Sequence, residues 1–184
     1  AYVPQLSAML PRALAEAAAG RPDVLMAQGR MIESLVGEQI NQGLQLSVSC
    51  SEDADRLRVD PADADTLMGT TFVSTLLAQC EAWPRGRRPA DFNEPVQSDD
   101  PVLLLSGEFD PVTPPRYGEQ VVTNLPNGRH LIVPGQGHSV MGRGCGPKLV
   151  DAFIDTADAK ALEADCLQEQ TPAPFFLNFS GSAP

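Results

Sequence analysis

The sequence predicts an α/β protein in which a mainly helical region precedes an incomplete parallel sheet. Two short runs, residues 102–105 and 131–133, are continuously apolar, as expected of parallel strands that are covered on both faces. A helical pattern follows each run, so the second half reads strand–helix–strand–helix. Two interior strands leave sheet edges unpaired. The sheet is therefore expected to be incomplete and to require partner strands.

The amino-acid composition limits the kinds of molecule that this chain is expected to bind. With 42% hydrophobic residues the 184-residue chain can form a core, and its net charge of -11 opposes nucleic-acid binding. No apolar run approaches the ~20 residues of a membrane span, and no signal-peptide pattern opens the chain. The basic cluster Arg85, Arg87 and Arg88 has no interleaved aromatic residue and is interpreted as a solvated loop.

The four cysteines indicate disulfides rather than a metal site. No Cys-x-x-Cys pair occurs and there are two histidines, so we expect neither zinc nor any other cofactor. An even count is typical of a secreted or periplasmic protein, although four buried free thiols are the alternative. Cys50 and Cys80 end two predicted elements on their buried faces, and Cys145 and Cys166 bracket a helical hairpin. We predict these two pairs.

The first half of the chain contains four predicted elements. An Ala-rich helix at about 11–19 ends at Gly20. Apolar residues at helical spacing predict a second helix over 23–41. Residues 44–50 alternate apolar and polar, which predicts a half-buried strand. A further helix starts at Asp60-Pro61 and ends at Cys80, before Trp83-Pro84. Its expected buried stripe is Met68, Phe72, Leu76 and Cys80.

A Pro-, Arg- and Asp-rich loop over about 85–100 then leads to the α/β half. The first run of this half is followed by a helix that opens at Pro114-Pro115, and Asn127-Gly128 turns the chain into the second run. Another helix starts at Pro147, and a final helix is predicted around Leu162 and Cys166. The tail at 171–176 is expected to be extended and to dock through its two Phe residues.

Asp110 and His138 are the candidate catalytic residues. Each lies just past the carboxyl end of a predicted strand, the edge at which open α/β sheets gather their functional groups. An Asp that accepts the imidazole N–H fixes the tautomer of the His and stabilises its cation. The alternative is a plain Asp-Pro turn and a loop histidine. No Gly-x-Ser-x-Gly occurs, neither Ser106 nor Ser139 is a convincing nucleophile, and His130 is interpreted as structural.

Four segments carry a resemblance to a known family. Residues 101–115 (PVLLLSGEFDPVTPP) and 135–138 (GQGH) resemble the acid-bearing and histidine-bearing segments of α/β-hydrolases, especially the tripeptidyl-aminopeptidase-like and prolyl-aminopeptidase-like serine peptidases. Residues 49–53 and 80–84 resemble further segments of the same group. The resemblance implies a helical lid at 1–90 and a C-terminal core segment at 91–184. It also implies that the nucleophile elbow and oxyanion hole lie before Ala1.

By this resemblance Asp110 is the triad acid and His138 the general base. Glu52 and Asp53 lie where the family often contacts substrate, and they are candidate ligands for a peptide α-amino group; two solvated turn acids are the alternative. The chain is thus expected to be the C-terminal part of a serine aminopeptidase that acts on peptides. The alternatives are an esterase acting on small esters, another α/β-hydrolase that uses an Asp nucleophile, or a non-catalytic interaction module. Its expected partners are the missing N-terminal segment and a second copy at the open sheet edge, and the chain alone is expected to be inactive.

Overall fold

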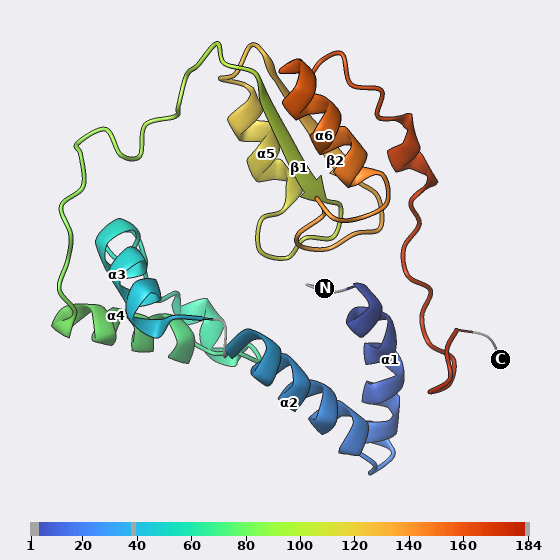
Figure 1. Ribbon diagram of the computed structural model, residues 1–184. Coiled ribbons are helices and arrows are strands. Elements are labelled where there is room, and N and C mark those ends of the chain that lie inside the picture. Colours follow the sequence, from blue (N-terminus) through green and yellow to red (C-terminus); the bar gives the residue numbers. More distant parts are fainter. Residues whose placement is uncertain (1–3, 38–39, 183–184) are drawn as a thin grey trace. The chain divides into compact units, whose positions relative to one another are not determined.

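The chain divides into two compact units, which are described separately. The computed structural model describes residues 4–37 and 40–182. The first unit comprises Ala1–Gly29 and Pro95–Pro184, and the second comprises Arg30–Glu94 (Figure 1). The first 29 residues thus group with the C-terminal half, and the expected division into segments 1–90 and 91–184 stays a prediction. That the helical region acts as a lid stays a prediction.

The first unit is built around two parallel strands. β1 (Val102–Gly107) pairs with β2 (Gly128–Val133) in the register Leu103↔Arg129 and Leu105↔Leu131. Helix α5 (Pro115–Val122) connects them, and α6 (Gly146–Thr156) follows β2. Both helices carry Pro in the first turn, where a missing N–H costs no helical bond. The predicted strand–helix–strand–helix order is confirmed.

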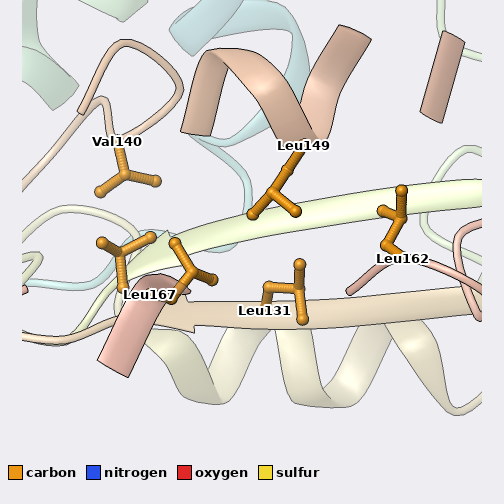
Figure 2. Close-up of a cluster of buried hydrophobic side chains, with 6 residues drawn as sticks. Leu131, Val140, Leu149, Leu162 and Leu167 are labelled. Atoms are coloured by element: carbon orange, nitrogen blue, oxygen red, sulfur yellow. The ribbon is translucent and has the colours of Figure 1, made fainter. Parts of the chain in front are cut away.

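The two faces of this sheet are covered by different helices, as Figure 2 shows. On the α6 side β2 contributes Leu131 and Val133 to a buried cluster that also includes Leu149 of α6, and Leu103 and Leu105 of β1 pack against it. Alternation of side chains along a strand turns the neighbouring residues to the α5 side, where Gly118 of α5 lies against the His130 ring. The remaining buried members of the cluster are Val140, Leu162 and Leu167.

Helix α1 (Pro4–Ala18) and the start of α2 (Asp23–Gly37) belong to the same unit. The Gln28 side chain donates to the Leu6 carbonyl at 2.7 Å, and the Phe176 N–H donates to the Ala8 carbonyl at 3.0 Å. The C-terminal tail thus bonds to α1 through its backbone. Phe175 is 65% exposed, so the expected docking of both Phe side chains is wrong for that residue.

The extents of these helices differ from the prediction. α1 begins at Pro4, seven residues before the predicted start at Pro11, and it continues through that proline. α2 ends at Gly37, and residues 38 and 39 of the predicted 23–41 helix lie outside the described residues.

The second unit is a disulfide-linked helical unit, and it corrects the prediction of a strand at 44–50. These residues form α3 (Gln42–Glu52). Asn41 caps this helix by accepting the Leu44 N–H at 3.0 Å. Leu46 and Cys50 are one turn apart and pack with Ala54, so the same residues satisfy a helical period. A lone strand here would have left its backbone groups unpaired.

Two other predicted helices are also corrected. The helix expected from Pro61 to Cys80 is split into a 3₁₀ helix, η1 (Pro61–Asp65), and α4 (Thr71–Ala82). Gly69 separates them with a φ of 57°, so Met68 and Phe72 are 70% and 64% exposed rather than buried. The helix expected around Leu162 and Cys166 is the 3₁₀ helix η2 (Asp165–Glu169). It follows a turn in which Asp158 accepts two backbone N–H groups.

Both predicted disulfides are present. Cys50 pairs with Cys80 in the second unit, and Cys145 pairs with Cys166 in the first. Both disulfides lie at the buried clusters. Cys50 and Cys80, which are 2% and 1% exposed, are members of the cluster in the second unit. Cys145 and Cys166 pack against the cluster in the first unit. No described helix is long and apolar enough to cross a membrane.

Candidate active site

Asp110 lies three residues beyond the end of β1 and is 6% exposed. Its Oδ1 accepts the backbone N–H groups of Val112 at 2.8 Å and Thr113 at 3.0 Å. Its Oδ2 accepts the Thr113 hydroxyl at 2.8 Å. Pro111 supplies no N–H of its own, so the turn offers the carboxylate the next two donors along the chain. The sequence Asp-Pro-Val-Thr therefore forms a turn whose own donors surround the buried carboxylate.

The hydrogen bonds that this turn donates determine the charge of Asp110. Burial by itself would raise the pKa of the carboxyl group. The N–H groups of Thr113 and Val112, the Thr113 hydroxyl and the His138 ring outweigh burial and lower the pKa from 3.8 to about 2. The side chain is therefore ionised at neutral pH despite being buried.

His138 meets this carboxylate from the loop after β2. Its Nδ1 lies 2.9 Å from Oδ2 of Asp110 and 3.4 Å from the Thr113 hydroxyl oxygen. Because an ionised carboxylate only accepts, Nδ1 is the protonated nitrogen in this pair. A neutral imidazole with its proton on Nδ1 carries its lone pair on Nε2. This tautomer is the one a general base requires.

The end of β1 holds the histidine loop, which we define as residues 134–145. The Phe109 N–H donates to the Gln136 carbonyl at 2.8 Å, and the Glu108 carboxylate accepts the Gly135 N–H at 2.8 Å. Gly107 lies so close to this loop that a Cβ there would overlap the Gly137 carbonyl oxygen. Glycine is therefore required at Gly107 for the acid turn and the histidine loop to approach each other.

A cavity of about 360 Å³ opens beside the pair. Ser139, next to His138, has a φ of 64°, which is unusual for a residue with a side chain. Such conformations persist where the surroundings hold them, often at functional sites. The cavity is lined by Leu105, Gly107, Asp110, Thr113, His138, Ser139, Val140, Met141 and Gly142.

Ser106 and His130 form a second pair that is separate from this site. The Ser106 hydroxyl lies 2.9 Å from Nε2 of His130. Burial lowers the pKa of His130, against the opposing charge of Glu119. A Cβ at Gly118 would lie 2.5 Å from the same nitrogen, so helix α5 packs tightly on the ring. The geometry supports the structural interpretation of His130.

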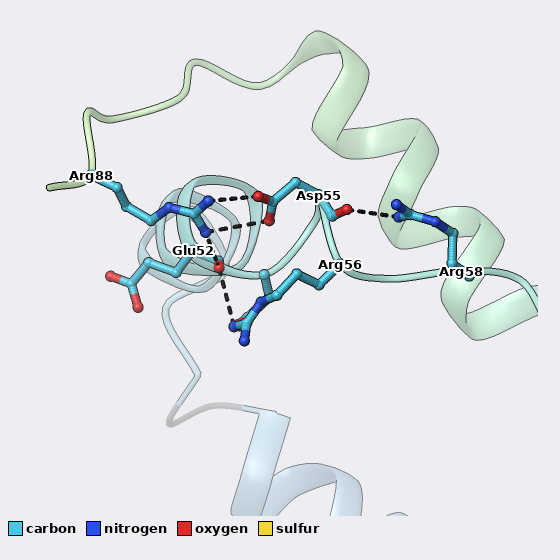
Figure 3. A network of polar contacts seen from close by, with 6 residues as sticks. Glu52, Asp55, Arg56, Arg58 and Arg88 are labelled. Atoms are coloured by element: carbon cyan, nitrogen blue, oxygen red, sulfur yellow. Dashed lines mark hydrogen bonds and ion pairs between the residues drawn. The ribbon is translucent and has the colours of Figure 1, made fainter. Parts of the chain in front are cut away.

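Glu52 and Asp53 lie in the other unit, at the end of α3. Figure 3 shows the polar network around them. The Asp53 carboxylate accepts from Arg56 at 2.9 Å. Arg88 donates to the Glu52 carbonyl at 2.6 Å and pairs with Asp55 at 2.6 Å. No described residue pairs with the Glu52 carboxylate, so of the two candidates for binding an α-amino group Glu52 has the less engaged side chain.

Sequence reasoning missed Thr113 and Glu108. Thr113 was visible as a hydroxyl residue three positions after Asp110, a spacing common where an Asp closes a turn. Glu108 carried no such signal, because its partner, the Gly135 N–H, belongs to another loop. No group of three potential metal ligands gathers among the described residues.

A protein-family model matches the part of the chain that contains this site. The TAP-like protein family of α/β-hydrolases matches residues 65–166, which is more than half of the chain. No curated protein matches the chain. The crystal structure of BpoC from Mycobacterium tuberculosis H37Rv, assigned as a non-heme bromoperoxidase, matches with 22% identity and a TM-score of 0.27. This match covers 62% of the present chain and 52% of BpoC, so the chain spans about half the length of that structure.

The family match confirms the predicted fold class. The strand–helix–strand–helix segment, with its Asp and His after successive strands, corresponds to the C-terminal part of an α/β-hydrolase fold. With more than half of its residues matched, this chain belongs to the TAP-like family of α/β-hydrolases.

Proposed function

We propose that this chain supplies the acid and the general base of a serine hydrolase, an aminopeptidase that cleaves peptides near their free N-terminus. The observation that carries the proposal is the 2.9 Å contact between Nδ1 of His138 and the buried, ionised carboxylate of Asp110. The nucleophile is assigned to a segment outside this chain, because the sequence contains no Gly-x-Ser-x-Gly.

His138 moves the protons in the proposed reaction, and Asp110 stabilises and orients it. Nε2 of His138 removes the proton from the nucleophilic serine as its oxygen attacks the scissile carbonyl carbon. Asp110 stabilises the resulting imidazolium and keeps its Nδ1 proton directed at Oδ2. The imidazolium then gives the proton to the leaving amine as the C–N bond breaks, which leaves an acyl-enzyme. The neutral imidazole then removes a proton from a water molecule as the water oxygen attacks the acyl carbon. The imidazolium returns that proton to the serine oxygen as the acyl–oxygen bond breaks, which releases the acid product and restores the serine.

Glu52 is the proposed ligand of the substrate α-amino group. The Glu52 carboxylate forms no direct ion pair with a described residue and can attract an ammonium group, whereas the Asp53 carboxylate is already paired with Arg56 at 2.9 Å. We therefore assign the larger share of amino-terminal recognition to Glu52. Replacing Glu52 by Gln is expected to raise KM for substrates with a free amino group and to leave N-acetylated substrates unaffected.

The two disulfides support an oxidising location for this protein, secreted or periplasmic. Cell fractionation that recovers the protein with both disulfides from the medium or the periplasm would agree with this proposal. Recovery from the cytoplasm with four free thiols would contradict it.

Turnover of model substrates tests the proposed activity. The protein, expressed with whatever segment its gene encodes before Ala1, is assayed with an aminoacyl p-nitroanilide and a p-nitrophenyl ester. His138→Ala and Asp110→Asn should each lower kcat by several orders of magnitude, whereas the matched control His130→Gln should retain activity. Hydrolysis of the ester alone would favour an esterase. Equal activity in His138→Ala and the wild type would refute the proposal.

The 184-residue chain by itself is expected to show no turnover, because a triad without its nucleophile leaves residual catalysis at most. Activity of the chain that disappears in His138→Ala would instead point to Ser106 or Ser139. Ser106→Ala and Ser139→Ala would then identify which of the two acts as the nucleophile.

A further inference from the structure

The histidine loop is bordered along its outer side by one short C-terminal segment, residues 166–172, which we call the tail buttress. Cys145 at the end of the loop is joined to Cys166 by a disulfide. Leu167, 2% exposed, belongs to the same buried cluster as Val140 of the loop, and Figure 2 shows these two side chains near each other. The loop and the buttress are therefore joined by a covalent bond, and their side chains belong to the same buried cluster.

The backbone of the loop is shaped to receive this segment. Gly135 and Gly144 lie near its two ends and have φ values of 67° and 52°, which favour glycine. A Cβ on Gly135 would overlap the backbone of Pro172, and a Cβ on Gly144 would overlap the side chain of Gln170. The buttress thus touches the loop on both sides of His138.

The inner side of the loop is held differently. There the Glu108 carboxylate and the Phe109 N–H bond to Gly135 and Gln136, both of which precede His138. After His138 the loop bonds mainly to itself, through the Arg143 N–H to the Val140 carbonyl and the Gly146 N–H to the Arg143 carbonyl. The half of the loop that follows His138 is therefore attached to the rest of the unit by the buried side chain of Val140 and by the buttress.

We propose that the tail buttress is a positioning element, which holds His138 in hydrogen-bonding register with Asp110 through the Cys145–Cys166 disulfide and the Gln170 side chain. Its catalytic relevance rests on the proposed function, but the positioning itself does not. A residue that acts this way touches no substrate. Its loss should loosen the 2.9 Å contact between the ring and the carboxylate before it unfolds the unit.

The two disulfides provide a matched comparison. They span 21 and 30 residues, so removing either one should cost a similar amount of global stability. Cys145–Cys166 borders the histidine loop, whereas Cys50–Cys80 belongs to the second unit. The readout is the proton on Nδ1 of His138, followed by ¹⁵N NMR of the 184-residue chain, because its exchange with water reports how well the contact to Asp110 is held.

In Cys145→Ser/Cys166→Ser the Nδ1 proton should exchange at least about tenfold faster or become unobservable, as expected for a contact weakened by about 1.4 kcal/mol. In Cys50→Ser/Cys80→Ser its exchange should match that of the wild type. Unchanged exchange in the first variant, or an equal change in both, would overturn the proposal.

Two substitutions of Gln170, which leave both disulfides intact, test the positioning role of the buttress if the first variant does not fold. Gln170→Ala removes the side chain that covers Gly144 and should speed the exchange, and Gln170→Met, which restores the length of the side chain, should slow it again. Wild-type exchange in Gln170→Ala would overturn the proposal. Because the measurement needs neither nucleophile nor substrate, it can succeed even if the protein proves not to be a hydrolase.

Discussion

At the scale of single residues, Asp110 combines deep burial with a low pKa, and this combination makes stability depend on pH. Folding lowers its pKa from 3.8 to about 2, which corresponds to about 2 kcal/mol of stability. This contribution is complete above pH ~4 and is lost as the pH falls towards ~2, because the unfolded chain binds the proton first. Between pH 5 and pH 2 the wild type should lose about 2 kcal/mol more than Asp110→Asn in urea unfolding. Parallel curves for the two proteins would contradict the buried, hydrogen-bonded carboxylate.

Thr113 is the residue that links the acid to the base. Its hydroxyl donates to Asp110 at 2.8 Å and lies 3.4 Å from Nδ1 of His138. Thr113→Val removes a hydrogen bond to a buried anion, so we expect a loss of about 1.5–3 kcal/mol in unfolding free energy and a rise in the pKa of Asp110. Thr113→Ser keeps the hydroxyl and should retain most of both. A Val variant with an unchanged Asp110 pKa, measured by NMR titration, would show that the hydroxyl does not stabilise the charge.

At the scale of elements, the approach of β1 to the histidine loop depends on Gly107. A Cβ at this position would lie 2.7 Å from the Gln136 carbonyl oxygen and closer still to that of Gly137. Gly107→Ala should therefore cost at least about 2 kcal/mol and lengthen the contact between Asp110 and His138. Gly142→Ala is the control within the same loop, because nothing lies within 4 Å of its Cβ position. Thermal unfolding of the two variants should differ clearly, and equal midpoints would refute the close approach.

In the second unit, Arg88 fastens the loop after α4 to the end of α3, as the dashed contacts in Figure 3 show. It donates to the Asp55 carboxylate and to the Glu52 carbonyl, both at 2.6 Å. Arg88→Ala should release the neighbouring Gly86 N–H from the Ser51 hydroxyl, a 2.8 Å bond, and so speed the exchange of that amide. Arg87→Ala is the matched control, because no described residue forms an ion pair with Arg87. Equal exchange of the Gly86 amide in the two variants would contradict a fastening role.

The elements also show which parts of the fold the sequence could predict. The continuous apolar runs of β1 and β2 allowed one interpretation, since their residues face helices on both sides, and the positions of Asp110 and His138 followed from them. Residues 44–50 allowed two interpretations, because Leu46 and Cys50 fit a helical turn as well as an alternating strand. The Asn41 cap decided between them. Glu108 could not be found at all, because its partner is a backbone group 27 residues away.

At the scale of the whole molecule, the two-stranded sheet has an open edge along β1. The Val102 N–H donates to the carbonyl of Asn127, just before β2, and the Glu108 N–H donates to that of Val133, the last residue of β2. Because N–H directions alternate along a strand, those of Leu103 and Leu105 point away from β2. Among the described residues no acceptor faces these two amides. A row of unpaired backbone groups beside apolar side chains favours pairing with another strand.

We therefore expect the isolated chain to self-associate through this edge. A second copy would then occupy the place that we propose for a strand of the segment that completes the hydrolase. The net charge of -11 opposes association, but salt screens it within about a Debye length, ~8 Å at physiological ionic strength. The amides of Leu104 and Ser106, which face β2, should be protected from exchange at every concentration. Those of Leu103 and Leu105 should gain protection as light scattering shows the mass rising above the 19.6 kDa monomer. A strict monomer in which all four amides are protected would mean that the chain covers its own edge and needs no partner strand there.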